Sequence, residues 1–244
     1  MSGVATLTVV RYSAARAVLG AARVATDVPT LARTPGLRFF KTMGTGSGIG
    51  FSAKPDLRTW TLFAAWESED AWERFRVASP VMRRHDAREE VYSLLLAPVD
   101  HHGRWSGAEP FGPPVPTARI ADDEPVAVLT RATIRPARAP AFWSRVAPGA
   151  GTLREERDLL ATFGFGEVPW LRQGTLSVWR TRAAMEAWAY RTPAHAETVR
   201  RTREEGWYAE ELFARFRFLR SYGTLRGRDP LAAINADPPA ARAC

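Results

Sequence analysis

The amino-acid sequence contains an internal repeat. Residues Thr59–Pro80 align with Arg172–Pro193 at an offset of 113 residues. Four pairs of residues match between the two copies: Trp66 with Trp179, Phe75 with Trp188, Ser79 with Thr192, and Pro80 with Pro193. Two residues beyond the matched prolines the copies differ, because the first has Met82 and the second has His195. The chain should therefore fold into two similar halves that differ chemically at this position, which the preceding Ser/Thr-Pro pair marks as the start of a helix.

Length and composition agree with two fused small domains. The chain has 244 residues, 45% of them apolar and 25% charged, and it contains nine tryptophans, as expected of a globular protein. Two halves of roughly 110 residues each fall within the usual size range of a domain. The predicted boundaries are residues 1–108 for an N-terminal ferredoxin-like repeat, 109–121 for a Pro-rich linker, 122–227 for a C-terminal ferredoxin-like repeat and 228–244 for a flexible tail.

Each half is predicted to follow the order β-α-β-β-α-β. In the first half we expect strands at Val4–Arg11, Leu37–Thr42, Thr59–Trp66 and Val91–Ala97, and helices at Ala14–Ala25, after the N-cap Ser68, and at Val81–Glu90. In the second half we expect strands at Val126–Thr133, Thr175–Trp179 and Leu212–Leu219, a glycine turn at Gly164 and Gly166, and helices at Ala139–Val146, Thr181–Tyr190 and Pro193–Glu205.

These elements predict an α+β fold. A four-stranded antiparallel sheet with helices on one face leaves its other face apolar, and that face must be buried. The sheet of the other half is the simplest partner. We therefore expect a tandem duplication of a ferredoxin-like βαββαβ unit that forms a single-chain pseudo-twofold dimeric α/β barrel, with a pocket between sheet and second helix in each half.

The net charge of +8 bears on the partners of the chain. Arginines are spread along the whole sequence rather than clustered, which argues against a nucleic-acid partner. The charge remains compatible with peripheral contact to an anionic membrane surface, or with an acidic cofactor such as a haem carrying propionates. The only cysteine is Cys244, and no signal-peptide pattern or apolar stretch of about 18 residues is present, so we expect a cytoplasmic protein.

The segment around His195 is the most informative candidate site. Thr192 and Pro193 are typical of a helix start, which places His195 in the first helical turn. Val199 shares the helix face of His195, and Arg200 and Arg203 lie on neighbouring faces. A neutral imidazole at this position can bind iron axially, with guanidinium groups near propionates. A histidine satisfied at a helix end is the alternative interpretation.

Other motifs give weaker signals. His101 and His102 lie in a predicted turn without further ligands, and His85, among arginines and aspartate, is expected on the surface. The glycine run Gly44–Gly50 lacks the lysine of a phosphate-binding loop and predicts a tight hairpin-like connection. No Gly-x-Ser-x-Gly motif occurs, so neither serine nor thiol nucleophilic catalysis is supported.

Several segments in both halves resemble the spheroidene monooxygenase family, the acyclic carotenoid 2-ketolases. The matching segments are Leu31–Pro35, Phe39 and Lys41, Gly44–Phe51, Trp105–Gly107, Leu129–Pro136, Phe142–Trp143, Gly164–Pro169, His195–Trp207 and Glu210–Leu212. The resemblance implies a haem-dependent monooxygenase that hydroxylates or ketolates an apolar or natural-product small molecule, with dioxygen as co-substrate.

The resemblance also implies roles for individual residues. It makes His195 the iron ligand of a haem b that Val199, Arg200 and Arg203 help to bind. Gln173 and Glu167 become candidate catalytic residues that line the distal side. An electron donor such as ferredoxin is implied as a partner, and the protein is expected to be a monomer or a homodimer.

Two alternative functions remain open from the sequence. The first keeps the haem but acts on an N–O or N–N substrate without inserting oxygen. The second is a cofactor-free barrel that binds or oxygenates a small molecule in a Trp-rich pocket.

Overall fold

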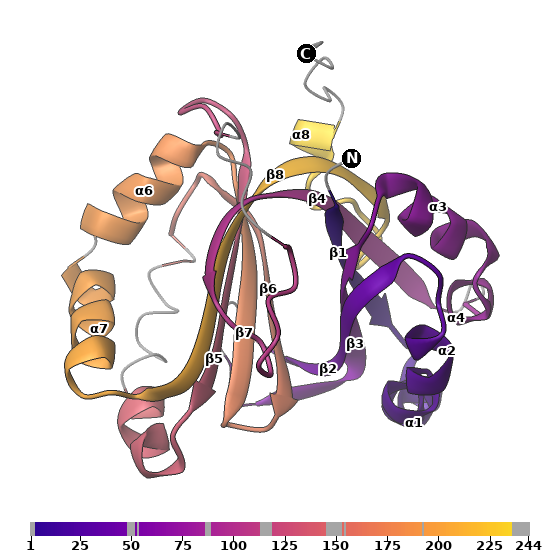
Figure 1. Cartoon of the computed structure of the whole chain (residues 1–244), viewed down its shortest axis with the longest axis horizontal. Coiled ribbons are helices and arrows are strands. Elements are labelled where there is room, and N and C mark those ends of the chain that lie inside the picture. Colours follow the sequence, from indigo (N-terminus) through magenta and orange to yellow (C-terminus); the bar gives the residue numbers. More distant parts are fainter. Residues whose placement is uncertain are drawn as a thin grey trace. The chain divides into compact units, whose positions relative to one another are not determined.

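The structure is a computed structural model, and it describes residues 3–47, 52, 54–85, 89–112, 119–144, 153, 155–191 and 193–235. In the first half the elements are β1 (Val4–Arg11), a 3₁₀ turn (Ala14–Arg16), α1 (Ala17–Thr26), α2 (Val28–Ala32), β2 (Leu37–Gly46), β3 (Pro55–Trp66), α3 (Glu69–Ala78), α4 (Pro80–Arg83) and β4 (Glu90–Gly103). In the second half they are β5 (Val126–Ile134), a 3₁₀ turn (Pro136–Arg138), β6 (Leu159–Val168), β7 (Arg172–Trp179), α6 (Arg182–Arg191), α7 (Pro193–Glu204), β8 (Tyr208–Gly223) and α8 (Ala232–Asn235) (Figure 1).

The predicted α+β fold is confirmed. Both halves place their strands in corresponding positions, with helices before the second and fourth strands of the first half. The eight strands follow the order β1-β3-β2-β6-β7-β5-β8-β4, which is that of a closed barrel. Within each half the first strand pairs antiparallel with the third and the fourth, as a ferredoxin-like unit requires.

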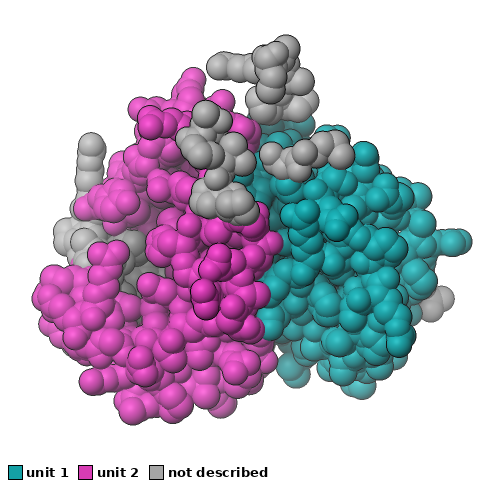
Figure 2. Space-filling model, viewed as in Figure 1, with its two compact units in different colours: residues 1–45, 56–98, 218–244 teal, residues 46–55, 99–217 magenta. Residues whose placement is uncertain are grey.

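The chain divides into two compact units (Figure 2). Unit 1 comprises residues 1–45, 56–98 and 218–244, and unit 2 comprises residues 46–55 and 99–217. In unit 1, Trp66 on β3 packs against Phe75 on α3 at a ring distance of 4.9 Å. In unit 2, the corresponding Trp179 on β7 packs against Trp188 on α6 at 5.4 Å. The repeated aromatic pair thus fastens a helix to a strand in each unit.

A second repeated feature is a tight turn at the end of the fourth strand. Residues 105–108 form it in unit 2 and residues 225–228 in unit 1, each closed by an isolated β-bridge. Glu210 accepts two backbone N–H groups of the first turn at 2.8 and 2.7 Å. Glu90 accepts the matching two of the second turn at 3.0 and 2.5 Å. A carboxylate at the start of one strand therefore caps a turn in each unit.

The N-cap of α3 is confirmed, but the helix predicted over Val81–Glu90 is wrong. Ser68 accepts a hydrogen bond from the backbone of Ala71 at 3.2 Å. The helix beyond Pro80 ends at Arg83, and Glu90 already belongs to β4. Residues 86–88 lie outside the described residues, and the following Glu89 is buried beside Arg16, an ionic partner at 3.0 Å that is distant in the sequence.

The glycines at 164 and 166 do not form the predicted turn. Both lie inside β6, where Gly166 pairs with Gln173 of β7. A Cβ atom on Gly166 would lie 2.8 Å from the side-chain nitrogen of Gln173. Glycine here makes room for a side chain of the neighbouring strand rather than for a bend.

Three further expectations are corrected or refined. His101 and His102 lie at the end of β4 and not in a turn. The glycine run begins inside β2, and a hydrogen bond from Ser47 to Lys54 of 2.8 Å closes the expected hairpin-like connection, while residues 48–51 lie outside the described residues. Of the predicted flexible tail, residues 229–235 are ordered, because Leu231 is buried and α8 follows it; residues 236–244 lie outside the description.

None of the helices in the described part of the chain is both long and apolar enough to cross a membrane.

Candidate active site

One face of the unit 2 sheet packs against α6. Val128 and Trp179 form an apolar cluster with Met185 of that helix, and Trp188 packs on Trp179. Because side chains alternate along a strand, every second residue of β5, β6 and β7 lies on this helix-facing side. In Figure 1, α6 and α7 both stand on this side of the sheet.

Beyond the α6 cluster, a group of small residues on the helix-facing side is only partly buried. The register of the strands places five of them together: Thr130, Thr162, Gly164, Thr175 and Ser177. We call this set the open face. Its counterparts in unit 1 are closed, since Leu62 is 8% exposed and Ala64, at the position of Ser177, is fully buried. Unit 2 is therefore accessible where unit 1 is packed.

Unit 1 has a cavity of about 50 Å³ at the place that corresponds to the open face. Its wall includes Thr8, which pairs with Leu62, and Met82 of α4. By the internal repeat, Met82 corresponds to His195, and Leu62 corresponds to Thr175. Repeat symmetry therefore predicts that position 195 looks onto the open face.

Position 195 belongs to α7, whose backbone the structure describes from Pro193 to Glu204. The side chains of His195 and Val199 lie outside the described residues. The far end of α7 is closed by the Trp207 backbone, which donates to the Thr202 carbonyl at 3.1 Å. Tyr208 also bonds the Thr202 side chain, and burial raises the pKa of this phenol to about 12.

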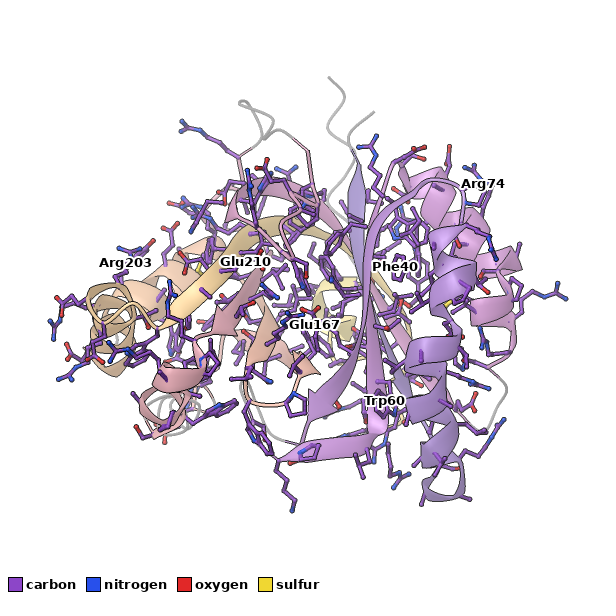
Figure 3. The ribbon with its side chains drawn as sticks, turned by 60° about the horizontal axis from the view of Figure 1, so that its bottom comes forward. Phe40, Trp60, Arg74, Glu167, Arg203 and Glu210 are labelled. Carbon is purple, nitrogen blue, oxygen red and sulfur yellow. The ribbon has the colours of Figure 1, made fainter. Side chains whose placement is uncertain are left out.

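The two arginines predicted to bind the cofactor differ in their surroundings. Arg200 is held by Glu197 at 2.8 Å and by Glu204 at 2.5 Å. Arg203 is exposed and lies at the outer edge of unit 2 (Figure 3), and no ion pair to it is recorded within the described ranges. Of the two guanidinium groups, that of Arg203 is therefore the more accessible to an anionic ligand.

Gln173 and Glu167 are not brought together on one face. Gln173 lies on the helix-facing side, two residues from Thr175, and is 8% exposed. Its side-chain nitrogen donates to the Val168 carbonyl at 3.1 Å, which fixes the orientation of the amide. Glu167 contacts Arg131, which follows Thr130 on β5 and so points to the opposite side.

Glu167 belongs instead to a buried ionic group that we call the Arg131 cluster, formed by Trp105, Arg131, Glu167 and Glu210. The Arg131 side chain is 1% exposed, and it bonds Glu167 at 3.1 Å and also Glu210. Trp105 donates to the same Glu167 oxygen at 2.7 Å and lies under the guanidinium. In Figure 3, Glu167 and Glu210 are labelled nearer the middle of the view than Arg203, which lies at the edge.

The two carboxylates of the Arg131 cluster compensate the buried guanidinium. Burial alone would raise the pKa of Glu210, but bonds from two backbone N–H groups and from Arg131 outweigh it and lower the pKa. The sequence interpretation missed Arg131. An arginine in the middle of the apolar strand Val126–Ile134 was the available signal, because a charge there needs a buried partner.

The prediction that His85 lies on the surface is wrong. Its side chain is 7% exposed, lines the unit 1 cavity and bonds the fully buried Glu89 carboxylate at 3.0 Å. Burial lowers the pKa of His85, against the opposing effect of Glu89, so the imidazole is neutral at pH 7. Arg16 at 3.0 Å and Arg23 at 3.7 Å place positive charge beside the buried Glu89 carboxylate.

Comparison with known proteins identifies the family. The chain is 41% identical over 200 residues to a spheroidene monooxygenase of Rhodobacter capsulatus, covering 82% of this chain and 83% of that protein. The chain belongs to the spheroidene monooxygenase family. A second member, from Cereibacter sphaeroides, is 36% identical over 84% of this chain and 63% of its own length. The resemblance predicted from the sequence is thereby confirmed, and the chain is an oxidoreductase of the monooxygenase class.

Two further comparisons concern family models and the fold. No family model matches the chain. Among solved structures, an aldoxime dehydratase superposes with a TM-score of 0.59 over 88% of this chain and 81% of its own, at 13% identity. At that identity the likeness extends to the fold alone, and it supports the α/β barrel architecture.

Proposed function

We propose that the protein is a haem-dependent monooxygenase that binds haem b between the open face and α7, with His195 as the axial ligand of the iron. Its substrate is an apolar small molecule, a polyene of the kind named for its relatives or a related natural-product intermediate. Dioxygen is the co-substrate, and electrons come from a separate donor such as a ferredoxin.

The observation that carries this proposal is the contrast between the two halves. In unit 1, Leu62 and Met82 close the space between sheet and helix down to a small cavity. In unit 2, Thr175 and His195 occupy the corresponding positions, and Thr175 stays half-exposed. The half that carries a potential iron ligand is thus the half whose sheet face is left accessible.

The residues of the open face fit a haem chemically. Threonine, serine and glycine side chains are short, so a flat macrocycle can approach the strands closely. A porphyrin iron needs only one protein ligand, and α7 offers a histidine in its first turn. Arg203 is available for a propionate, whereas Arg200 would have to leave Glu197 or Glu204.

When bound, the haem supplies the activation of dioxygen that oxidation of an unactivated carbon requires. The chain itself binds and orients the substrate. Gln173 presents a fixed amide at the edge of the open face, where it can hydrogen-bond a newly formed hydroxyl or keto group. Glu167 acts from the other side of the sheet as a positioning residue, because it ties β6 to β5 through Arg131.

Absorption spectroscopy of the purified protein titrated with haemin tests this proposal. We expect a Soret band for the natural protein, its loss or shift in His195→Ala, and its return when imidazole is added. His101→Gln is the matched control, because His101 bonds the Gly112 carbonyl away from the open face.

His102 is the alternative iron ligand to test, since its ring stacks at 5.3 Å on Phe213, the direct neighbour of Thr130. The variant His102→Ala tests it. A purified protein that takes up no haemin contradicts the proposal that haem is the cofactor. A Soret band that survives His195→Ala but not His102→Ala contradicts the assigned ligand. Turnover that continues in ferrous protein without oxygen contradicts the monooxygenase reaction.

A further inference from the structure

The turn between β6 and β7 contains a tryptophan where the backbone favours glycine. Leu171 donates to the Pro169 carbonyl at 2.8 Å and to the Val168 carbonyl at 3.2 Å, which closes a tight turn with Pro169 and Trp170 at its centre. Trp170 has a φ of +62°. Proline followed by a residue of positive φ is the pattern of a type II turn, in which glycine or asparagine is normal at the second central position. A bulky aromatic residue there strains the backbone.

Burial of the indole does not offset this strain, because Trp170 is 56% exposed. Val168, at the start of the turn, is 37% exposed as well. Trp143 lies beneath them, and its indole nitrogen donates to the Trp170 carbonyl at 3.0 Å. The turn is therefore a braced apolar projection, which we call the Trp170 tip (Trp143, Val168, Pro169 and Trp170). A strained and exposed tryptophan indicates a role outside the folded core.

Three exposed arginines surround the tip: Arg135, Arg138 and Arg172. Two contacts bring them to it, because Thr133 pairs with Arg172 and Ile134 donates to the Leu171 carbonyl at 2.7 Å. No ion pair to these three is recorded for the described part of the chain, whereas Arg200 on α7 is held by two glutamates. In Figure 1, the β6–β7 turn and the segment that follows β5 both lie at the lower end of unit 2.

We propose that the Trp170 tip docks on an anionic phospholipid bilayer. Tryptophan prefers the headgroup region, where its ring is buried and its N–H stays hydrated, and arginines beside it meet lipid phosphates. This inference deepens the proposed function: an apolar polyene resides in a bilayer, and the tip lies three residues from Gln173 at the edge of the open face. Docking would bring the membrane, and the polyene substrate dissolved in it, next to the open face.

Co-sedimentation with vesicles tests the inference without relying on the haem. The probes are phosphatidylcholine vesicles and the same vesicles with roughly a third phosphatidylglycerol. We expect the protein to bind the anionic vesicles and to bind the neutral ones much more weakly. Trp170→Gly should lower the partition coefficient about tenfold or more, because it removes the inserted ring. Each of R135Q, R138Q and R172Q should lower it roughly fivefold, on anionic vesicles only.

The substitutions are chosen so that stability and binding move differently. Trp170→Gly relieves the turn, so its melting temperature should equal or exceed that of the natural protein. Trp170→Asn, which also tolerates positive φ, should behave alike. Val77→Ser is the control, because Val77 on α3 is 63% exposed and lies outside the tip; its vesicle binding should not change.

Several outcomes overturn the docking surface. One is equal binding of Trp170→Gly and the natural protein to anionic vesicles. Another is a lower melting temperature for both Trp170 variants, which assigns the ring a structural role. A third is a natural protein that elutes as a homodimer in size-exclusion chromatography and Trp170 variants that elute as monomers, which makes the tip a chain-to-chain interface. The Soret band of haemin-loaded Trp170→Gly should match the natural protein, so absent haem binding alongside intact vesicle binding contradicts the proposed function alone.

Discussion

Replacement of Glu210 by glutamine measures what the Arg131 cluster contributes to stability. The carboxylate is 25% exposed and accepts two backbone N–H groups at 2.8 and 2.7 Å in addition to the bond from Arg131. Ser106 and Arg131 donate to one carboxylate oxygen and Gly107 donates to the other, so an amide oxygen at the first place keeps two bonds in neutral form. The bond from Gly107 is lost and the bond from Arg131 loses its ionic part, at about 1.5 kcal/mol each, the lower end of the range for charged partners. We expect Glu210→Gln to lower the free energy of unfolding by about 3 kcal/mol.

The chain provides its own control in Glu90→Gln. Glu90 caps the matching turn through two backbone N–H groups at 3.0 and 2.5 Å, and no arginine contact to it is recorded among the described residues. This variant should lose only the turn bond, about 1.5 kcal/mol. The difference between the two variants therefore measures the bond between Glu210 and Arg131. We expect this difference to exceed about 1 kcal/mol, because Glu210→Gln leaves the buried Arg131 guanidinium with Glu167 as its one carboxylate partner in the cluster.

Urea unfolding followed by tryptophan fluorescence and circular dichroism gives both free energies. The pKa of Glu210 is lowered in the folded protein, so the unfolded chain binds the proton more readily. The stability from this carboxylate is thus complete above its unfolded pKa of about 4.3 and disappears as the pH falls through the folded value. The gap between the natural protein and Glu210→Gln should narrow on acidification. Equal losses in Glu210→Gln and Glu90→Gln at pH 7, or a gap that does not narrow, would refute the reasoning.

Three more substitutions have defined outcomes. Gly103→Ala should lower the free energy of unfolding by more than about 2 kcal/mol, because φ is +88° and the new Cβ would lie 2.1 Å from a carbonyl oxygen on β8. Gly107→Ala, at φ +75° in open space, should lower it by about 1 kcal/mol. Similar denaturation midpoints for the two variants would contradict this reasoning. His85→Gln should reduce the loss of stability between pH 7 and 5, since the buried neutral imidazole of the natural protein resists protonation below its ordinary pKa of 6.5 and the unfolded chain does not; parallel pH profiles would argue against it. Ser68→Ala should lower the free energy of unfolding by about 1 kcal/mol through loss of the α3 cap, and an unchanged thermal midpoint would show that the cap is dispensable.

The order of elements was predictable because it depends on short-range patterns. Alternation of β-branched residues marked β1, and Ser68 marked the start of α3. The repeated aromatic residues marked the duplication, and the structure shows that each pair joins a helix to a strand in its own unit. The prediction failed at β6, because Gly164 and Gly166 serve the side chains of a neighbouring strand, and a local pattern does not contain that neighbour.

The candidate site shows the same division. From the repeat, the sequence alone identified His195 as the position where the two halves differ, and it grouped Gln173 with Glu167 because both lie in one family-like segment. Only the strand register separated these two, since it sends Gln173 to the helix-facing side and Glu167 to Arg131.

The sequence by itself thus determined the duplicated architecture and the residue types available in each half. The tertiary structure decided which sheet face is closed and which stays accessible, and it alone buried His85 beside Glu89. The physical reason is that periodicity fixes the side of its own strand to which a residue points, whereas closure of a face, or compensation of a buried charge, depends on atoms supplied by segments far away along the chain.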